Sequence, residues 1–190
     1  MQTELTANRV GGCAFGAMIF AGFGCGWMFW SLAAMHRIAT VTAIGVDLGA
    51  LALLGAAVYV RRQARRWPSV PGKPGMWRAF AWINVIQWTA IAAVVFGFSR
   101  LHIGAYGAAA VTMIVGLHCL PLARLFRYPM HYVTGAVLVA WAAVSALLFS
   151  PDVVEGAAAL GTGVILWVSA VVMLVLVMRS MAAETAVQSA

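Results

Sequence analysis

The sequence predicts an all-α, polytopic membrane protein with six transmembrane helices, a plan compatible with three helical hairpins. Of its 190 residues, 64% are hydrophobic and only 9% are charged, whereas a soluble domain carries roughly 25% charged residues. The apolar residues fall into runs that reach or approach the ~20 residues needed to cross ~30 Å of hydrocarbon. These runs are apolar on all sides, which favours helices over the alternating strands of a barrel, and in lipid a helix satisfies its own backbone.

Six apolar runs define the expected elements of a single transmembrane domain over residues 1–190. The first run is longer than the roughly 7–15-residue apolar region of a signal peptide and is therefore expected to be a spanning helix. The expected helices cover 10–35, 38–60, 77–99, 101–124, 132–149 and 157–178.

The one long connection covers residues 61–76 and is both basic and rich in proline. It contains four arginines and one lysine between its ends, with Pro68, Pro71 and Pro74 at intervals of three. Proline lacks a backbone donor and favours extended backbone, so this composition predicts an extended, solvated loop with no helix.

The distribution of cations predicts that both termini are cytoplasmic. With six crossings, ten Lys and Arg residues fall on the side of the N-terminus, and two, Arg37 and Arg100, fall on the other side. We therefore expect a multi-pass protein of the bacterial inner membrane, with the 61–76 loop facing the cytoplasm. There its cations can attract anionic lipid headgroups, at roughly 1 kcal/mol each. The net charge of +7 does not indicate nucleic-acid binding, because no soluble segment carries a basic stripe with interleaved aromatic residues.

Asp47 is the most informative candidate residue, because it is the only acid inside an expected helix. It follows Arg37 by ten residues, which places it about 15 Å deep, where a carboxylate costs at least ~2.5 kcal/mol. Small residues share its helix face, which predicts that the carboxyl points into the bundle. Two interpretations stay open: a site for a proton, cation or substrate, and a protonated acid that only hydrogen-bonds a neighbouring helix.

Asn84, Gln87 and His118 are the other polar residues inside expected helices that can form a site. Asn84 and Gln87 lie one turn apart on the third helix, and each either lines a cavity or joins two helices through hydrogen bonds. His118 lies three residues before Pro121. Because proline has no backbone N–H, one carbonyl of the helix loses its hydrogen-bond donor, which predicts a kink beside His118. The histidine is either a titrating group of a cavity or a neutral core residue.

The remaining histidines and the three cysteines predict no metal site and no cofactor. His36 and His102 lie at the expected outer boundary and His131 at the inner one, which leaves a haem-binding redox protein as a third functional alternative. The cysteines form no C-x-x-C pair and are interpreted as small buried hydrophobic residues. The glycines of the first helix, at 12, 16, 22, 24 and 26, predict close helix contact rather than a pore.

A resemblance is carried by the segment 116–126, which reads G-L-H-C-L-P-L-A-R-L-F, followed by Tyr128-Pro129 and Thr134-Gly135. It resembles a segment of a family of small uncharacterised bacterial six-helix membrane proteins. The resemblance implies a fold and no activity. The plan of three hairpins in 190 residues is also similar, in architecture alone, to acid-resistance membrane proteins of the HdeD type.

Together these observations predict a small inner-membrane protein with an intramembrane polar site that binds or moves a proton or a small solute. The site would be built by Asp47, Asn84, Gln87 and His118, because the second, third and fourth helices are expected to pack together. The alternative is a non-transporting membrane subunit or stress-response scaffold, in which these residues only fix helix packing. No catalytic residues and no enzyme activity are expected, since nucleotide, metalloprotease and hydrolase motifs are absent. The lipid bilayer is the expected partner, and the sequence is compatible with an oligomer.

Overall fold

The structure, a computed structural model, describes residues 5–36, 40–70 and 74–188. Over these ranges it is helical without strands, and six helices are long and apolar enough to cross a membrane. The predicted six-helix membrane fold is therefore confirmed. The helices are α1 (Ala7–Ala34), α2 (Thr40–Gln63), α3 (Met76–Arg100), α4 (Gly107–Phe126), α5 (Met130–Leu148) and α6 (Val154–Gln188), with short 3-10 turns η1 (Ala64–Arg66) and η2 (Gly104–Tyr106).

Three helices end at residues with left-handed backbone conformation. His36 after α1, His102 after α3 and Arg127 after α4 have φ of 50°, 56° and 52°. Such residues commonly terminate helices, and histidine is among the non-glycine types that adopt this conformation more readily. The two outer histidines thus have a structural explanation as helix ends. Helix α4 starts at Gly107 and not at the predicted residue 101, because the turn at His102 and the 3-10 turn η2 precede it.

Helix α6 extends ten residues beyond the predicted end at residue 178. The segment 180–188 contains no glycine or proline, and it includes three alanines, one methionine and one glutamate, which favour helix even outside a bilayer.

The predicted extended loop is wrong for residues 61–66. Helix α2 continues through Arg61 and Arg62, and η1 follows directly. The next residues fold back on the start of α1, where the backbone N–H of Ala7 donates to the carbonyl of Pro68 at 3.0 Å. The side-chain amide of Asn8 donates to the carbonyl of Val70 at 2.6 Å. Arginine is a good helix former, and the first proline comes only at position 68, so nothing stops α2 earlier.

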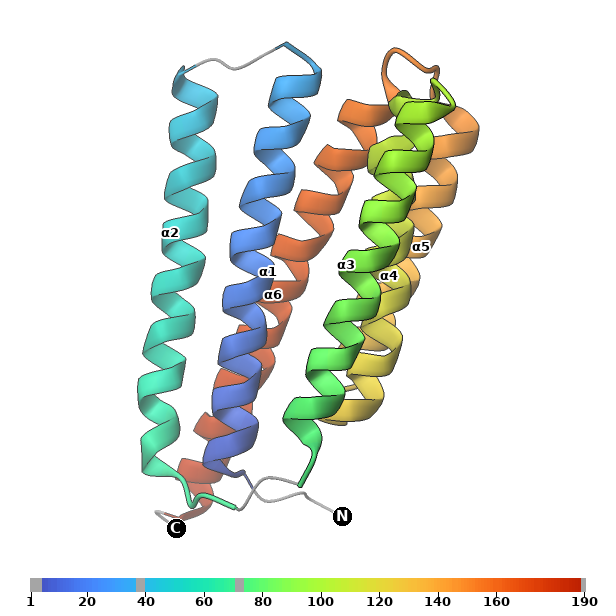
Figure 1. Ribbon diagram of the computed structural model, residues 1–190. Coiled ribbons are helices and arrows are strands. Elements are labelled where there is room, and N and C mark those ends of the chain that lie inside the picture. The colour runs from blue at the N-terminus through green and yellow to red at the C-terminus, as the bar shows by residue number, and fades with distance from the viewer. Residues whose placement is uncertain (1–4, 37–39, 71–73, 189–190) are drawn as a thin grey trace.

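Helix α6 lies in the middle of the bundle and packs against α1, α2, α4 and α5. Helix α2 forms one flank, and α3, α4 and α5 form the other (Figure 1). The consecutive pairs α1–α2, α3–α4 and α5–α6 each pack together, as three hairpins require. Helix α3 is the least covered, since none of its residues is buried.

Glycines allow the closest helix crossings. A Cβ at Gly163 of α6 would lie 2.9 Å from the carbonyl oxygen of Gly24 of α1, and one at Gly116 of α4 would lie 2.9 Å from that of Gly135 of α5. A Cβ at Gly49 of α2 would lie 2.6 Å from the indole of Trp167. Without a hydrophobic force between helices in lipid, such close contact is the main source of packing energy.

Buried hydroxyl groups add hydrogen bonds between α6 and its neighbours. Thr112 of α4 and Thr162 of α6 are 2.7 Å apart, and Thr134 of α5 donates to Ser169 of α6 at 2.9 Å. Each such bond contributes about 0.6 kcal/mol in membrane proteins. The polar groups enclosed at the centre of the bundle thus satisfy one another and serve packing.

Both ends of the described chain lie on the same side of the bundle (Figure 1). The described arginines at that end are Arg9, Arg61, Arg62, Arg65, Arg66, Arg78, Arg124, Arg127 and Arg179. Arg100 lies at the other end, while Arg37 and Lys73 lie outside the described residues.

The orientation can be tested at Ser69, which is exposed in the connection after η1. We expect Ser69→Cys, with the half-buried Cys25 changed to alanine, to resist an impermeant thiol reagent on intact cells and to react after lysis. The physical reason is the excess of cations on that side. Labelling on intact cells would reverse the assigned orientation.

Candidate functional site

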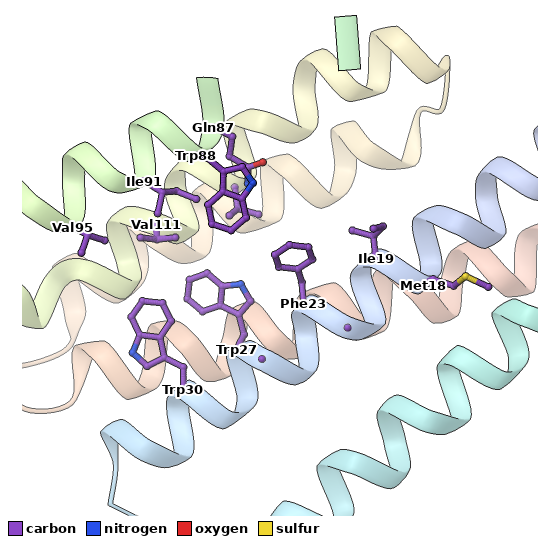
Figure 2. Close-up of a pocket in the computed structure, with 13 residues that line it drawn as sticks. Met18, Ile19, Phe23, Trp27, Trp30, Gln87, Trp88, Ile91, Val95 and Val111 are labelled. Carbon is purple, nitrogen blue, oxygen red and sulfur yellow. The ribbon is translucent and has the colours of Figure 1, made fainter. Parts of the chain in front are cut away.

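A groove between α1 and α3 has a volume of about 560 Å³. Figure 2 shows Phe23, Trp27 and Trp30 of α1 and Trp88 and Ile91 of α3 around the same space. Val111 and Val115 of α4 also line it. A cavity of this size is in the range that holds a drug-sized molecule.

The spacing of the lining residues explains why the groove exists. On α1 they recur with helical period on one face, as Met18, Ile19, Gly22, Phe23, Gly26, Trp27 and Trp30. Gly22 and Gly26 stand in the middle of this face, and a Cβ at either position would meet nothing within 4 Å. The wall of α1 therefore lacks side chains where α3 passes. The prediction that the glycines of this helix serve helix contact holds for Gly16 and Gly24, where an added Cβ would meet side chains of α6. It is wrong for Gly12, Gly22 and Gly26.

The groove occupies the outer half of the membrane in the assigned orientation. Trp30 lies twelve residues after Met18, so the lining of α1 extends about 18 Å along the helix axis, slightly more than half of ~30 Å of hydrocarbon. Its outer end is marked by a polar contact, since the indole N–H of Trp30 donates to Glu155 at 2.9 Å. Trp27 and Trp30 stack on each other with ring centroids 4.9 Å apart.

Gln87 is the one predicted site residue that lines this groove. It lies nine residues after Arg78, so about 14 Å deep, near the midplane. Its amide is half-buried and has no hydrogen bond within the described part of the chain. An unpaired amide in hydrocarbon is costly, so the groove provides a donor and an acceptor at its inner end for a polar group of a ligand.

Asn84 and His118 lie elsewhere. The side-chain amide of Asn84 donates to the carbonyl of Phe80 in its own helix at 2.8 Å. His118 is half-buried on α4 and interacts with the backbone of Ile83 on α3. Helix α4 continues through Pro121. Both side chains lie outside the groove lining.

The prediction that Asp47 points into the bundle is wrong for the single chain. Helix α2 buries Ala50 and Ala57, whereas Asp47 is exposed. Ala50 follows Asp47 by three positions. At 100° per residue, the Asp47 side chain therefore points about 60° away from the buried direction of Ala50. The small residues near Asp47 are therefore a packing face, and the carboxyl lies at its edge.

The predicted cluster of four polar residues does not form within one chain. Helix α2 packs against α1 and α6 on one flank, while α3 and α4 pack together on the other (Figure 1). The expectation that α2, α3 and α4 pack together holds for α3 with α4 and fails for α2, because α1 and α6 lie between α2 and α3.

A second cluster lies at the inner end of the bundle around His131. The ring of His131 is 93% buried and contacts Phe20, Phe126 and Tyr128, with centroid distances of 5.6, 6.5 and 5.5 Å. Its Nδ1 has no hydrogen-bond partner among the residues that the structure describes. Burial raises the pKa of Tyr128, which lies in the α4–α5 connection. The cluster is closed by aromatic rings and fixes α5 against α1.

The groove was not predicted from the sequence, although a signal was present. The residues of α1 that line it alternate small and aromatic residues at helical spacing, and Trp88 and Gln87 stand side by side on α3. Such a pattern serves equally well for a tight helix contact. Only the separation of α1 from α3 makes it a cavity.

Within the described residues no group of three or more His, Cys, Asp or Glu side chains is placed to hold a metal ion. Comparison with family models, with curated proteins and with solved structures finds no match to this chain. The candidate site is therefore defined by its geometry: an aromatic, laterally placed groove in a six-helix membrane protein, with one unpaired amide at its inner end.

Proposed function

We propose that this chain is a multi-pass protein of the bacterial inner membrane that binds a lipid-soluble small molecule in the α1–α3 groove. The ligand class is a flat ring with a carbonyl or hydroxyl group, joined to a hydrocarbon tail, as in the isoprenoid quinones. The observation that carries this proposal is the unpaired amide of Gln87 in a groove otherwise lined by apolar and aromatic side chains.

The lining supports each part of such a ligand. Aromatic rings prefer offset or edge contacts with other rings, and Phe23, Trp27 and Trp88 supply them near Gln87 (Figure 2). Ile91 and Val95 continue the apolar wall toward the outer end of α3, where a tail would lie. A groove with few, well-placed polar groups is typical of small-molecule sites.

The groove favours a neutral ligand over an ion or a proton. No acidic or basic side chain lines it, and an ion in hydrocarbon needs a charged or strongly polar partner. The small solute predicted from the sequence is therefore proposed to be an apolar one. In the rival interpretation, a non-transporting membrane subunit or stress-response scaffold, the polar residues only fix helix packing.

The proposal is tested by tryptophan fluorescence of the purified protein in lipid nanodiscs, titrated with a decyl-substituted benzoquinone. We expect saturable quenching, because a quinone ring in the groove touches Trp27 and Trp88. The change Gln87→Leu should weaken binding about three- to tenfold, since one net hydrogen bond contributes about 0.5–1.5 kcal/mol. Asn84→Leu is the matched control, because this amide is one turn away and bonds its own helix.

Decylcyclohexane, which has a ring and tail but no carbonyl, serves as the competitor. Competition that is equal for wild type and Gln87→Leu is expected, since this molecule cannot use the amide. If quenching is linear and unsaturable, the ring does not bind. If Gln87→Leu and Asn84→Leu behave alike, the amide has no role and the proposed ligand class is wrong.

A further inference from the structure

The outward face of α2 carries a continuous exposed seam. Its residues follow one another at intervals of four, three, four, four and three, as Thr40, Ile44, Asp47, Leu51, Gly55 and Val58. All six are exposed, with 52% of Ile44 and 63% of Leu51 accessible. This spacing is that of the contact positions along two helices that cross at a small angle.

Asp47 distinguishes this seam from an ordinary lipid-facing helix surface. Exposed leucine or isoleucine is satisfied by lipid. An exposed carboxyl in the membrane costs ~2.5 kcal/mol or more unless it finds a hydrogen-bond partner or water. Within the described residues Asp47 makes no hydrogen bond, and it lies ten residues after Arg37, so about 15 Å along the helix axis. No described residue supplies a partner for Asp47, and a second chain in the membrane can supply one.

A second copy meets this need by symmetry. Two copies in one membrane share the same orientation, so a two-fold axis along the membrane normal brings the two Asp47 residues to the same depth. A protonated carboxyl both donates and accepts, so the pair is complementary to itself. Gly55 lies two turns further along the seam, where a Cβ would meet nothing within 4 Å of its own chain, and a glycine there permits close approach of the second helix.

We propose that the protein forms a homodimer through the α2 seam, with the two Asp47 carboxyls hydrogen-bonded to each other at its centre. Single polar residues in an otherwise apolar helix contact fix register and oligomeric state. The interface uses α2 alone, on the flank opposite α3, and does not involve the groove. Failure of the dimer and failure of the proposed ligand are therefore separate results.

The test uses a matched pair of glycines on α2. Gly55 lies on the seam and Gly45 lies beside it, and both are exposed with nothing within 4 Å of an added Cβ. The stoichiometry of each variant is measured by single-molecule photobleaching across a range of protein densities in lipid vesicles. We expect wild type to dimerise, Gly55→Leu to raise the dissociation constant at least tenfold, and Gly45→Leu to leave it within about threefold.

Asp47 variants test the centre of the seam. Asp47→Asn should keep the dimer, because an amide pair also donates and accepts, whereas Asp47→Leu should weaken it by removing the need for a partner. A second readout is disulfide formation by Leu51→Cys in membranes, with Cys25 changed to alanine. Wild type that is monomeric at every density, equal effects of Gly55→Leu and Gly45→Leu, or a different protein bound to α2 would each overturn the proposal.

Discussion

Replacing Gly116 by leucine is expected to separate α4 from α5 and to leave little folded protein. A Cβ at Gly116 would lie 2.9 Å from the carbonyl oxygen of Gly135 and 3.0 Å from the backbone nitrogen of Val139. Backbone atoms cannot move aside as a flexible side chain can, so the two helices must part along their length. Overpacking usually costs about 1–3 kcal/mol. The cost of Gly116→Leu should lie at or above the upper end of this range, because the α4–α5 crossing also positions the buried Thr134–Ser169 hydrogen bond.

The measurement is the fraction of monodisperse protein after extraction, followed by unfolding in increasing sodium dodecyl sulfate. Gly97→Leu is the control, because Gly97 is also a helical glycine of a spanning segment but has nothing within 4 Å of an added Cβ. We expect Gly97→Leu to unfold near the wild-type midpoint. A Gly116→Leu protein that extracts and unfolds like Gly97→Leu would contradict the close α4–α5 crossing.

Replacing Gly26 by leucine is expected to abolish ligand binding while leaving the fold intact. The new side chain enters the groove from the wall of α1 between Phe23 and Trp30. A Cβ added at Gly26 would meet nothing within 4 Å. It therefore displaces a ligand without pushing a helix. Loss of the aromatic contacts and of the hydrogen bond to Gln87 together should reduce affinity at least a hundredfold, about 2.7 kcal/mol.

Benzoquinone quenching provides the measurement, and Gly12→Leu provides the control on the same helix. Gly12 is also exposed with nothing within 4 Å of an added Cβ, but it lies outside the groove. Unfolding midpoints of both variants should match wild type. Unchanged binding by Gly26→Leu, with an unchanged unfolding midpoint, would place the ligand elsewhere on the protein.

The sequence was sufficient for the fold because the bilayer imposes one dominant requirement. Apolar length predicted each spanning helix, and the positions of arginine predicted which ends face the same side. Prediction from the sequence failed at helix ends that lie outside the bilayer, where α2 continues through Arg62 and α6 continues past Arg179. There local propensity decides, and hydrophobicity carries no information.

The candidate site was harder to predict because it depends on which helices do not touch. Hydropathy and depth singled out Asp47 first, with Asn84, Gln87 and His118 beside it, and of these four only Gln87 lines the groove. Helix order around a bundle is set by close contacts such as Gly24 with Gly163, which join the first and last helices of the chain. No local pattern predicts this pairing, and it is this pairing that removes α2 from α3 and opens the groove.

The central claim, that the α1–α3 groove holds a lipid-soluble ligand, is tested most directly by an experimental structure of the protein in a lipid nanodisc with the decyl-benzoquinone. The proposal predicts ring density between Trp27 and Trp88, with one ring oxygen within hydrogen-bonding distance of the Gln87 amide and the tail along Val95. A groove that is closed by α3 packing on α1, or that is filled by an ordinary phospholipid chain with the quinone absent, would contradict it.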